Sequence, residues 1–289
     1  MTSLSRREFN RLAIAAVPLL ARRSMSQAKP LTAREVVERI QQNIGVPWRA
    51  QTSDTFKAGD EDAVVTGIAT TVMSTYGVLQ KAAAAKRNLI ITHEPTFYTG
   101  NDNVSELTDN ALYLRKLAFI KAHDLVVWRF HDHWHARRPE PMGTALAQFL
   151  GWARYPVSEQ RVYTIPPSTL ATIVKEVKAK LHVQAVRLIG DPETRVTRVA
   201  FLPGTPPSSI SVARVLPNVD LVIVGEQREW EGIYYAHDAV TSGEKKGLIA
   251  IGHAISEDPG MKLCADWLKT FISEVPVAWI PAGEPFAKI

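Results

Sequence analysis

Histidines and carboxylates gather directly after three short apolar runs of this sequence, residues 88–92, 125–130 and 248–252. Imidazole and carboxylate groups together are typical ligands of zinc, iron, manganese and nickel. The clusters contain five of the eight histidines in the chain, and they therefore indicate a metal site. The candidate metal ligands are the following side chains: His93, Glu94, His131, Asp132, His135, His253 and Glu257.

Buried strands are the elements that must position these clusters. A short apolar run bounded by polar residues is typical of a buried strand. In open α/β sheets, ligands bind just beyond the carboxyl ends of the strands. We therefore expect three clusters that are far apart in the sequence to converge at one edge of a sheet.

The number of candidate ligands exceeds the four that one tetrahedral zinc ion needs. At least three histidines together with carboxylates that can bridge suit two divalent ions about 3.5–4 Å apart. Such a pair lowers the pKa of a shared water and holds a phosphoryl or carbonyl oxygen. The HExxH pattern of many zinc proteases is absent around His253. The sequence predicts two divalent ions, with zinc, iron, manganese and nickel as candidates.

The second cluster leaves its ligands open. His131, His133 and His135 alternate, so that they would share one face of an extended segment. Asp132 either binds the metal or accepts the ring N–H of a ligand histidine. A polar loop with no metal is the alternative interpretation of this segment.

The expected elements alternate between strands and helices. Residues 31–44 form a predicted helix, with Thr32 and Glu35 as its capping box. Residues 259–271 continue the alternation, and His253 and Glu257 would share one face if their segment is helical. The alternation predicts an α/β fold with mostly parallel sheets and flanking helices. Residues 155–205 read as a smaller α+β sub-region that separates the clusters. We therefore expect two related α/β halves with the metal site between them.

The N-terminus has the pattern of a twin-arginine export signal. Arg6 and Arg7 precede a short apolar stretch, residues 12–21, and small residues at 26–28 suit cleavage. Residues 1–28 are the predicted signal peptide of a periplasmic or extracellular protein, and residues 29–289 the mature domain. The apolar stretch is too short for a stable membrane anchor.

Charge gives no reason to expect a nucleic-acid partner. The first 28 residues hold five arginines and one glutamate, which account for +4 of the net charge of +5. The remaining chain is nearly neutral, and bulk electrostatics would not attract a polyanion to it. The single cysteine, Cys264, excludes an intramolecular disulfide and suits a packed, inert thiol.

Two further polar residues follow the apolar run 219–224. Glu226 is a candidate general acid or base, and Arg228 a candidate grip for an anionic oxygen. A loop that caps a helix is the equally weighted alternative.

The chain resembles the Nif-three-like (NGG-interacting-factor-like) proteins, a dinuclear-metal family often classed as type-two GTP cyclohydrolases. The resemblance runs from about Leu31 to the C-terminus. It is carried by residues 88–95, 131–136, 224–226, 252–257 and 260–261. It implies α/β subunits with two metals each, assembled as ring-shaped homo-hexamers.

Two positions depart from the family pattern. The first cluster of the family is usually His-His, whereas the second residue here is Glu94. The second cluster is usually a histidine followed four residues later by an aspartate. This register aligns His131 with the family's histidine and His135 with its aspartate. An alignment shifted to keep a carboxylate at the second position would select Asp132 instead. We expect His135 to bind the metal directly and Asp132 to orient an imidazole or complete the site.

The predicted function is a metal-dependent hydrolase that uses a metal-activated water on a small-molecule substrate, with nucleotides and other phosphoesters as candidates. A non-enzymatic metal-binding protein or metallochaperone is the alternative. A storage or delivery protein needs neither an open coordination position nor an adjacent acid or base, so the geometry of the site separates the two.

Overall fold

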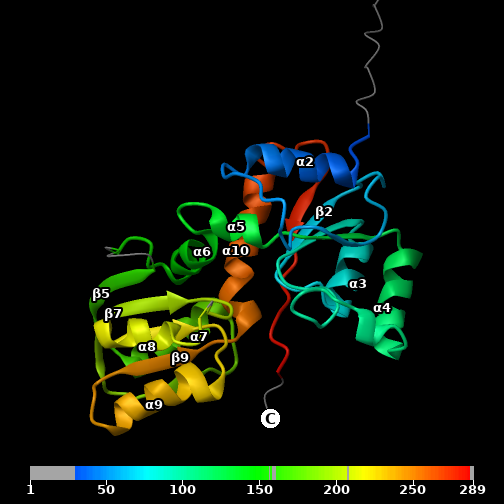
Figure 1. Ribbon diagram of the computed structural model, residues 1–289. Coiled ribbons are helices and arrows are strands. Elements are labelled where there is room, and N and C mark those ends of the chain that lie inside the picture. The colour runs from blue at the N-terminus through cyan, green and yellow to red at the C-terminus, as the bar shows by residue number, and fades with distance from the viewer. Residues whose placement is uncertain (1–29, 156, 158–160, 207, 287–289) are drawn as a thin grey trace, which may run out of the picture. The chain divides into compact units, whose positions relative to one another are not determined.

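The computed structural model describes residues 30–155, 157, 161–206 and 208–286, and the predicted export segment lies outside these ranges. Leu31–Ile289 form one compact unit. Two five-stranded sheets flanked by helices make up this unit (Figure 1). The predicted α/β class is therefore confirmed. Within the described ranges, no helix has both the length and the apolar character needed to cross a membrane.

The first sheet carries two of the predicted clusters. Its strand order is β1 (Phe56–Ala58), β4 (Val126–Arg129), β3 (Leu89–Thr92), β2 (Ile68–Thr71) and β10 (Val277–Trp279). The last four strands are parallel, and only β1 is antiparallel to its neighbour. The strands β2, β3 and β4 are buried along their whole length. This burial explains why they read as continuous apolar runs.

Three helices accompany the first sheet: α2 (Ala33–Asn43), α3 (Tyr76–Ala84) and α4 (Ala111–Ala122). The capping box predicted for the first of them is present, because Thr32 accepts from the Glu35 N–H and the Glu35 carboxylate accepts from the Thr32 N–H. A single-turn 3₁₀ helix, Ser105–Leu107, precedes α4.

The second sheet has the strand order β5 (Val162–Thr169), β7 (Arg195–Leu202), β8 (Leu221–Val224), β9 (Gly247–Ala250) and β6 (Arg187–Ile189). Its three central strands are parallel, and both edge strands are antiparallel. The strands of residues 155–205 thus share one sheet with β8 and β9. The helical segments of this half are α7 (Leu170–Leu181), α8 (Ser211–Val215), the 3₁₀ turn Leu216–Asn218, the π-helix Glu229–Ile233 and α9 (Tyr234–Thr241).

Helix α10 (His253–Leu268) connects the two sheets (Figure 1). It starts directly after β9, and its buried side chains join the core around the first sheet, where it also packs against α6 (Pro141–Leu150). The helix starts before the expected segment 259–271, so that Pro259 lies inside it and His253 and Glu257 share one helical segment. Residues 254–261 are all buried. Tertiary packing here outweighs the cost of a proline in a helix.

Candidate metal centre

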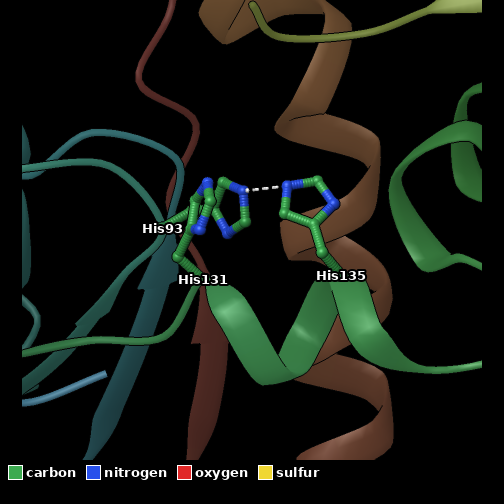
Figure 2. A group of neighbouring side chains, drawn as sticks. All are labelled: His93, His131 and His135. Carbon is green, nitrogen blue, oxygen red and sulfur yellow. Dashed lines mark hydrogen bonds between the residues drawn. The ribbon is translucent and has the colours of Figure 1, made fainter. Parts of the chain in front are cut away.

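Strand ends and one short helix bring the first two clusters together. His93 directly follows β3, and His131 lies between β4 and helix α5 (Asp132–Ala136). Because the segment turns into a helix, His131 and His135 lie four residues apart on one helical face. Figure 2 shows the rings of His93, His131 and His135 gathered around one point. The expectation of an extended segment with three aligned histidines was therefore wrong.

His133 points away from this group into the protein. Its side chain is fully buried, and its Nδ1 lies 2.6 Å from Oδ2 of Asp54. The ring stacks on Trp48 with 3.6 Å between centroids and an interplanar angle of 6°. His133 is therefore a structural residue that packs helix α5 against Trp48 and Asp54.

Asp54 holds the start of helix α5, and the sequence contained no signal for this role. Its Oδ1 accepts the backbone N–H groups of His131 and Asp132 at 2.6 and 2.9 Å. Its Oδ2 accepts the backbone N–H of His133 at 2.9 Å. One buried carboxylate thus satisfies the unpaired N–H groups of a helix start. It also orients the face that carries His131 and His135.

Four imidazoles of the centre each have an acceptor at Nδ1. The acceptor is a backbone carbonyl for His93 and a carboxylate for the other three. The Nδ1 contacts are His93 to Phe130 O at 3.0 Å, His131 to Asp132 Oδ1 at 2.9 Å, His135 to Glu140 Oε1 at 2.8 Å and His253 to Glu226 Oε1 at 3.5 Å. Each acceptor favours the proton on Nδ1, which leaves the lone pair of the neutral ring on Nε2. This is the arrangement by which proteins orient histidines that bind metals.

The Nε2 atoms converge with two carboxylates. Nε2 of His93 lies 3.1 Å from Nε2 of His135. Nε2 of His253 lies 3.2 Å from Oε1 of Glu94 and 3.1 Å from Oε2 of Glu257. Two triads have ligand atoms close enough to hold a metal ion, His93 with His131 and His135, and His93 with Glu94 and Glu257.

The electrostatics of the cluster favour a cation. Burial opposes a charge on His253, but the hydrogen bonds that its ring donates to Glu226, Glu257 and Glu94 raise its pKa to about 12. Burial and the neighbouring histidines His135 and His131 lower the pKa of His93 well below its usual value, so this ring is neutral. Burial raises the pKa of Glu94, but its hydrogen bond with His253 outweighs burial and lowers it. Ionised carboxylates beside inward-facing imidazole lone pairs fit a divalent metal.

Asp132 has the position of an orienting residue. Its Oδ2 accepts from the Thr52 hydroxyl and the Ser53 N–H, both at 2.9 Å, and its Oδ1 faces the His131 ring. Burial opposes its ionisation, but these hydrogen bonds hold the pKa of the carboxyl well below its usual range. Both oxygens are therefore already occupied within the protein.

Neither Glu226 nor Arg228 lines the cavity that opens beside the converging ligand atoms. Oε1 of Glu226 accepts from the Thr205 hydroxyl and faces Nδ1 of His253, behind the imidazole. Its hydrogen bond with His253 lowers the pKa of Glu226 to about 2, against the effect of burial. A carboxylate with this pKa suits a residue that orients His253 better than a general acid or base. Arg228 is mostly exposed and pairs with Glu231 at 3.2 Å.

Two other supporting residues were absent from the sequence predictions. Glu140 accepts the N–H groups at the start of α6 and also faces Nδ1 of His135. Gly204 follows β7 with a φ of +63°, and a Cβ there would collide with the Glu257 carboxylate. The lack of a side chain at Gly204 therefore permits both the left-handed backbone and the close approach of Glu257. For Glu140, the proline that follows it is a sequence signal of a helix start. Gly204 had no such signal.

A cavity of about 550 Å³ opens beside the cluster. Candidate ligands from both sheets line it, among them Glu94, His135 and Glu257, and so do the two arginines Arg49 and Arg161. Its volume lies within the range of small-molecule sites. The centre is therefore accessible to a ligand other than the metal.

Known proteins share this fold. A hypothetical protein of Staphylococcus aureus matches with a TM-score of 0.70 and 20% identity, over 90% of this chain and 100% of the other. A Bacillus cereus protein described as related to NIF3 matches with a TM-score of 0.69 and 14% identity, over 91% of this chain and 100% of the other. Identities of this size show the fold alone.

Sequence comparisons extend the likeness beyond the fold. A Clostridium acetobutylicum protein named GTP cyclohydrolase 1 type 2 homolog is 22% identical over 180 residues, which span 58% of this chain and 65% of that protein. The family model described as Duf34/NIF3 (NGG1p interacting factor 3) matches residues 25–284. A match over this share of the chain shows the family, as the resemblance of the motifs had indicated. The chain belongs to the Duf34/NIF3 (NGG1p interacting factor 3) family.

Proposed function

We propose that the chain is a dinuclear metal protein that hydrolyses a small-molecule substrate. The observation that carries the proposal is the orientation of four imidazoles, which direct Nε2 toward one another and toward two carboxylates. This arrangement supports a metal centre whatever the reaction, whereas the hydrolase assignment also depends on the adjacent cavity.

The ligands divide into two groups. Nε2 of one imidazole binds one metal, so His93 belongs to a single group, and we assign it to the site with His131 and His135. Glu94, His253 and Glu257 form the second group. Oε2 of Glu257 lies 3.7 Å from Nε2 of His93 and 3.1 Å from Nε2 of His253. Glu257 would therefore be close enough to hold a metal ion of either group.

Divalent ions at this position would lower the pKa of a water and polarise a phosphoryl or carbonyl oxygen. The chain's own residues orient the ligands, since Glu140, Glu226 and Asp132 each face the outer nitrogen of one imidazole. A delivery or storage protein needs no room beside its metal. The cavity of about 550 Å³ therefore favours hydrolysis over the metallochaperone alternative.

Elemental analysis followed by a substrate panel tests this function. We expect about two divalent ions per natively folded chain, and turnover of at least one phosphoester or nucleotide by the loaded protein only. GTP belongs in the panel because the Clostridium acetobutylicum relative is named a GTP cyclohydrolase 1 type 2 homolog. Less than one metal per chain would remove the dinuclear centre. Full metal content without any turnover would favour the non-enzymatic alternative.

Metal binding is expected to release a proton and to strengthen as the pH rises. The pKa of His253 in the metal-free protein is raised to about 12, so this ring is protonated at neutral pH and must lose its proton to bind a metal. The apparent affinity should therefore increase about tenfold per pH unit for each proton displaced. Calorimetric titrations with zinc in two buffers of different ionisation enthalpy measure the release. Equal heats in both buffers would contradict it.

Export by the twin-arginine route also stays a prediction. Changing Arg6 and Arg7 to Lys is expected to leave the precursor in the cytoplasm, because the pair is the recognised feature of the signal. Fractionation followed by detection of the mature chain measures the outcome. The same exchange at Arg22 and Arg23 is the matched control and should leave export unchanged. Normal export of the Arg6 and Arg7 variant would show that the assignment is wrong.

Partners follow from the same proposal. The cavity would receive the small-molecule substrate, and the homo-hexamer implied by the family resemblance stays a prediction. Exposed aromatic side chains at Trp230, Tyr234 and Tyr235 lie on one stretch of the second half and are available for contacts between subunits.

A further inference from the structure

Two arginines are the cationic side chains of the cavity beside the metal centre. Arg49 precedes the loop that holds Asp54, and Arg161 directly precedes β5. Neither is a candidate metal ligand, because a guanidinium has donors and no acceptor. Their presence beside a cluster of metal-binding groups therefore calls for a separate role.

The backbone of Arg49 is anchored, whereas its guanidinium is available to a ligand. The Arg49 N–H donates to Nε2 of His133 at 2.9 Å, and the neighbouring Trp48 stacks on the same ring. The guanidinium comes no closer than 3.9 Å to Oδ2 of Asp132, which already accepts two hydrogen bonds. Among the described residues no side chain or carbonyl accepts a hydrogen bond from this guanidinium. Its side chain is 57% exposed.

The guanidinium of Arg161 is held more firmly than that of Arg49, but some of its N–H donors are not engaged by Glu140. One terminal nitrogen lies 3.0 Å from Oε2 of Glu140, whose other oxygen faces His135. The aliphatic stem passes over Gly143, where a Cβ would lie 3.2 Å from Cγ of Arg161. A guanidinium has five N–H donors, and the pair with Glu140 engages only one terminal nitrogen. The remaining donors can bind a ligand in the cavity.

The charge of the lining selects an anion once metal is bound. Three carboxylates, from Glu94, Asp132 and Glu257, face two guanidinium groups in the cavity. Glu140, which pairs with Arg161, adds a fourth carboxylate, so that two divalent ions are needed to make the sum positive. Guanidinium groups bind phosphate through paired, charge-assisted hydrogen bonds. The cavity would then attract a phosphate group and hold it by geometry as well as charge.

We propose that Arg49 and Arg161 form a subsite for a phosphate group of the substrate, next to the metal centre. The proposal rests on the proposed function, because the metal supplies the charge that makes the cavity attractive to an anion. It replaces the prediction that Arg228 grips an anionic oxygen, since Arg228 pairs with Glu231 outside this cavity. The substrate class is a small molecule with a phosphate beside the bond that is cleaved.

Titration of inorganic phosphate into metal-loaded protein tests the subsite. Unbound metal is removed first, and elemental analysis confirms the metal content of each variant. Arg49→Gln and Arg161→Gln are each expected to weaken phosphate binding roughly 10-fold or more, because each removes a charged hydrogen-bond donor. Arg49→Lys should recover only part of the affinity, since an ammonium group keeps the charge and loses the paired geometry.

Arg39→Gln is the matched control, because Arg39 is paired with Glu274 outside the cavity. Its phosphate affinity should equal that of the wild type. Phosphate that binds the metal alone would give equal affinities for all variants, and this result would overturn the subsite. A loss of phosphate affinity in Arg228→Gln alone would also overturn the subsite.

Metal content separates failure of the subsite from failure of the proposed function. If the wild type holds no metal, the proposed function fails, and the titration is repeated on the metal-free protein. Dependence of phosphate binding on Arg49 and Arg161 would still support the subsite there. No phosphate binding by the metal-loaded wild type at millimolar concentration would overturn the subsite.

Discussion

Replacing His253 by Ala and Glu257 by Gln together is expected to remove most of the metal from the folded protein. These side chains lie 3.1 Å apart and come from the first two turns of α10. The double change removes the imidazole of one group and the carboxylate between the groups. Loss of supporting residues typically costs about 10–100-fold in metal affinity. The loss of two direct ligands should exceed that range.

Elemental analysis of the purified variant measures this loss, and circular dichroism verifies that the fold is intact. The matched control changes His237 to Ala and Asp238 to Asn, because this pair has the same chemistry but lies exposed on α9. The control should keep the metal content of the wild type. A variant that retains full metal would exclude His253 and Glu257 as ligands and overturn the proposed centre.

The second large effect is expected at the cluster where the family register and carboxylate chemistry disagree. Purified His135→Ala should hold almost no metal at the site that His135 forms with His93 and His131. Asp132→Asn should still bind metal, about 10–100-fold more weakly. The reason is geometric, because Nε2 of His135 faces Nε2 of His93, whereas both oxygens of Asp132 are occupied by Thr52, Ser53 and His131.

A competitive chelator titration measures both affinities on the same scale. Glu140→Gln is a useful third variant, because Glu140 faces Nδ1 of His135 as Asp132 faces Nδ1 of His131. It should resemble Asp132→Asn in the size of its effect. Tighter binding by His135→Ala than by Asp132→Asn would show that the aspartate is the ligand and that the register is wrong.

Local sequence patterns predicted much of the fold. The capping box of Thr32 and Glu35 and the apolar strands β3 and β4 depend on residues only a few positions apart. The same locality explains why His93 was recognised as a candidate, since it directly follows a buried strand. Such features are visible without knowledge of the tertiary structure because their determinants are neighbours in the chain.

Predictions were wrong or missing where distant residues decide the conformation. Residues 131–135 were expected to be extended, but Asp54, 77 residues before His131, caps them as a helix. Helix α10 starts before Pro259 because buried contacts outweigh the local signal. The approach of Gly204 to Glu257 joins segments that are far apart in the sequence.

Residue types and their spacing were enough to predict the α/β class, the strand ends that carry His93 and His131, and the chemistry of the candidate ligands. Which atoms face the centre depends on tertiary contacts. These contacts turn His133 away, place Asp132 and Glu226 behind imidazoles, and bring Arg49 and Arg161 to the cavity. The chemical type of a residue determines which groups its side chain can bind. The direction in which it points depends on hydrogen bonds and packing with residues that the chain brings close only on folding.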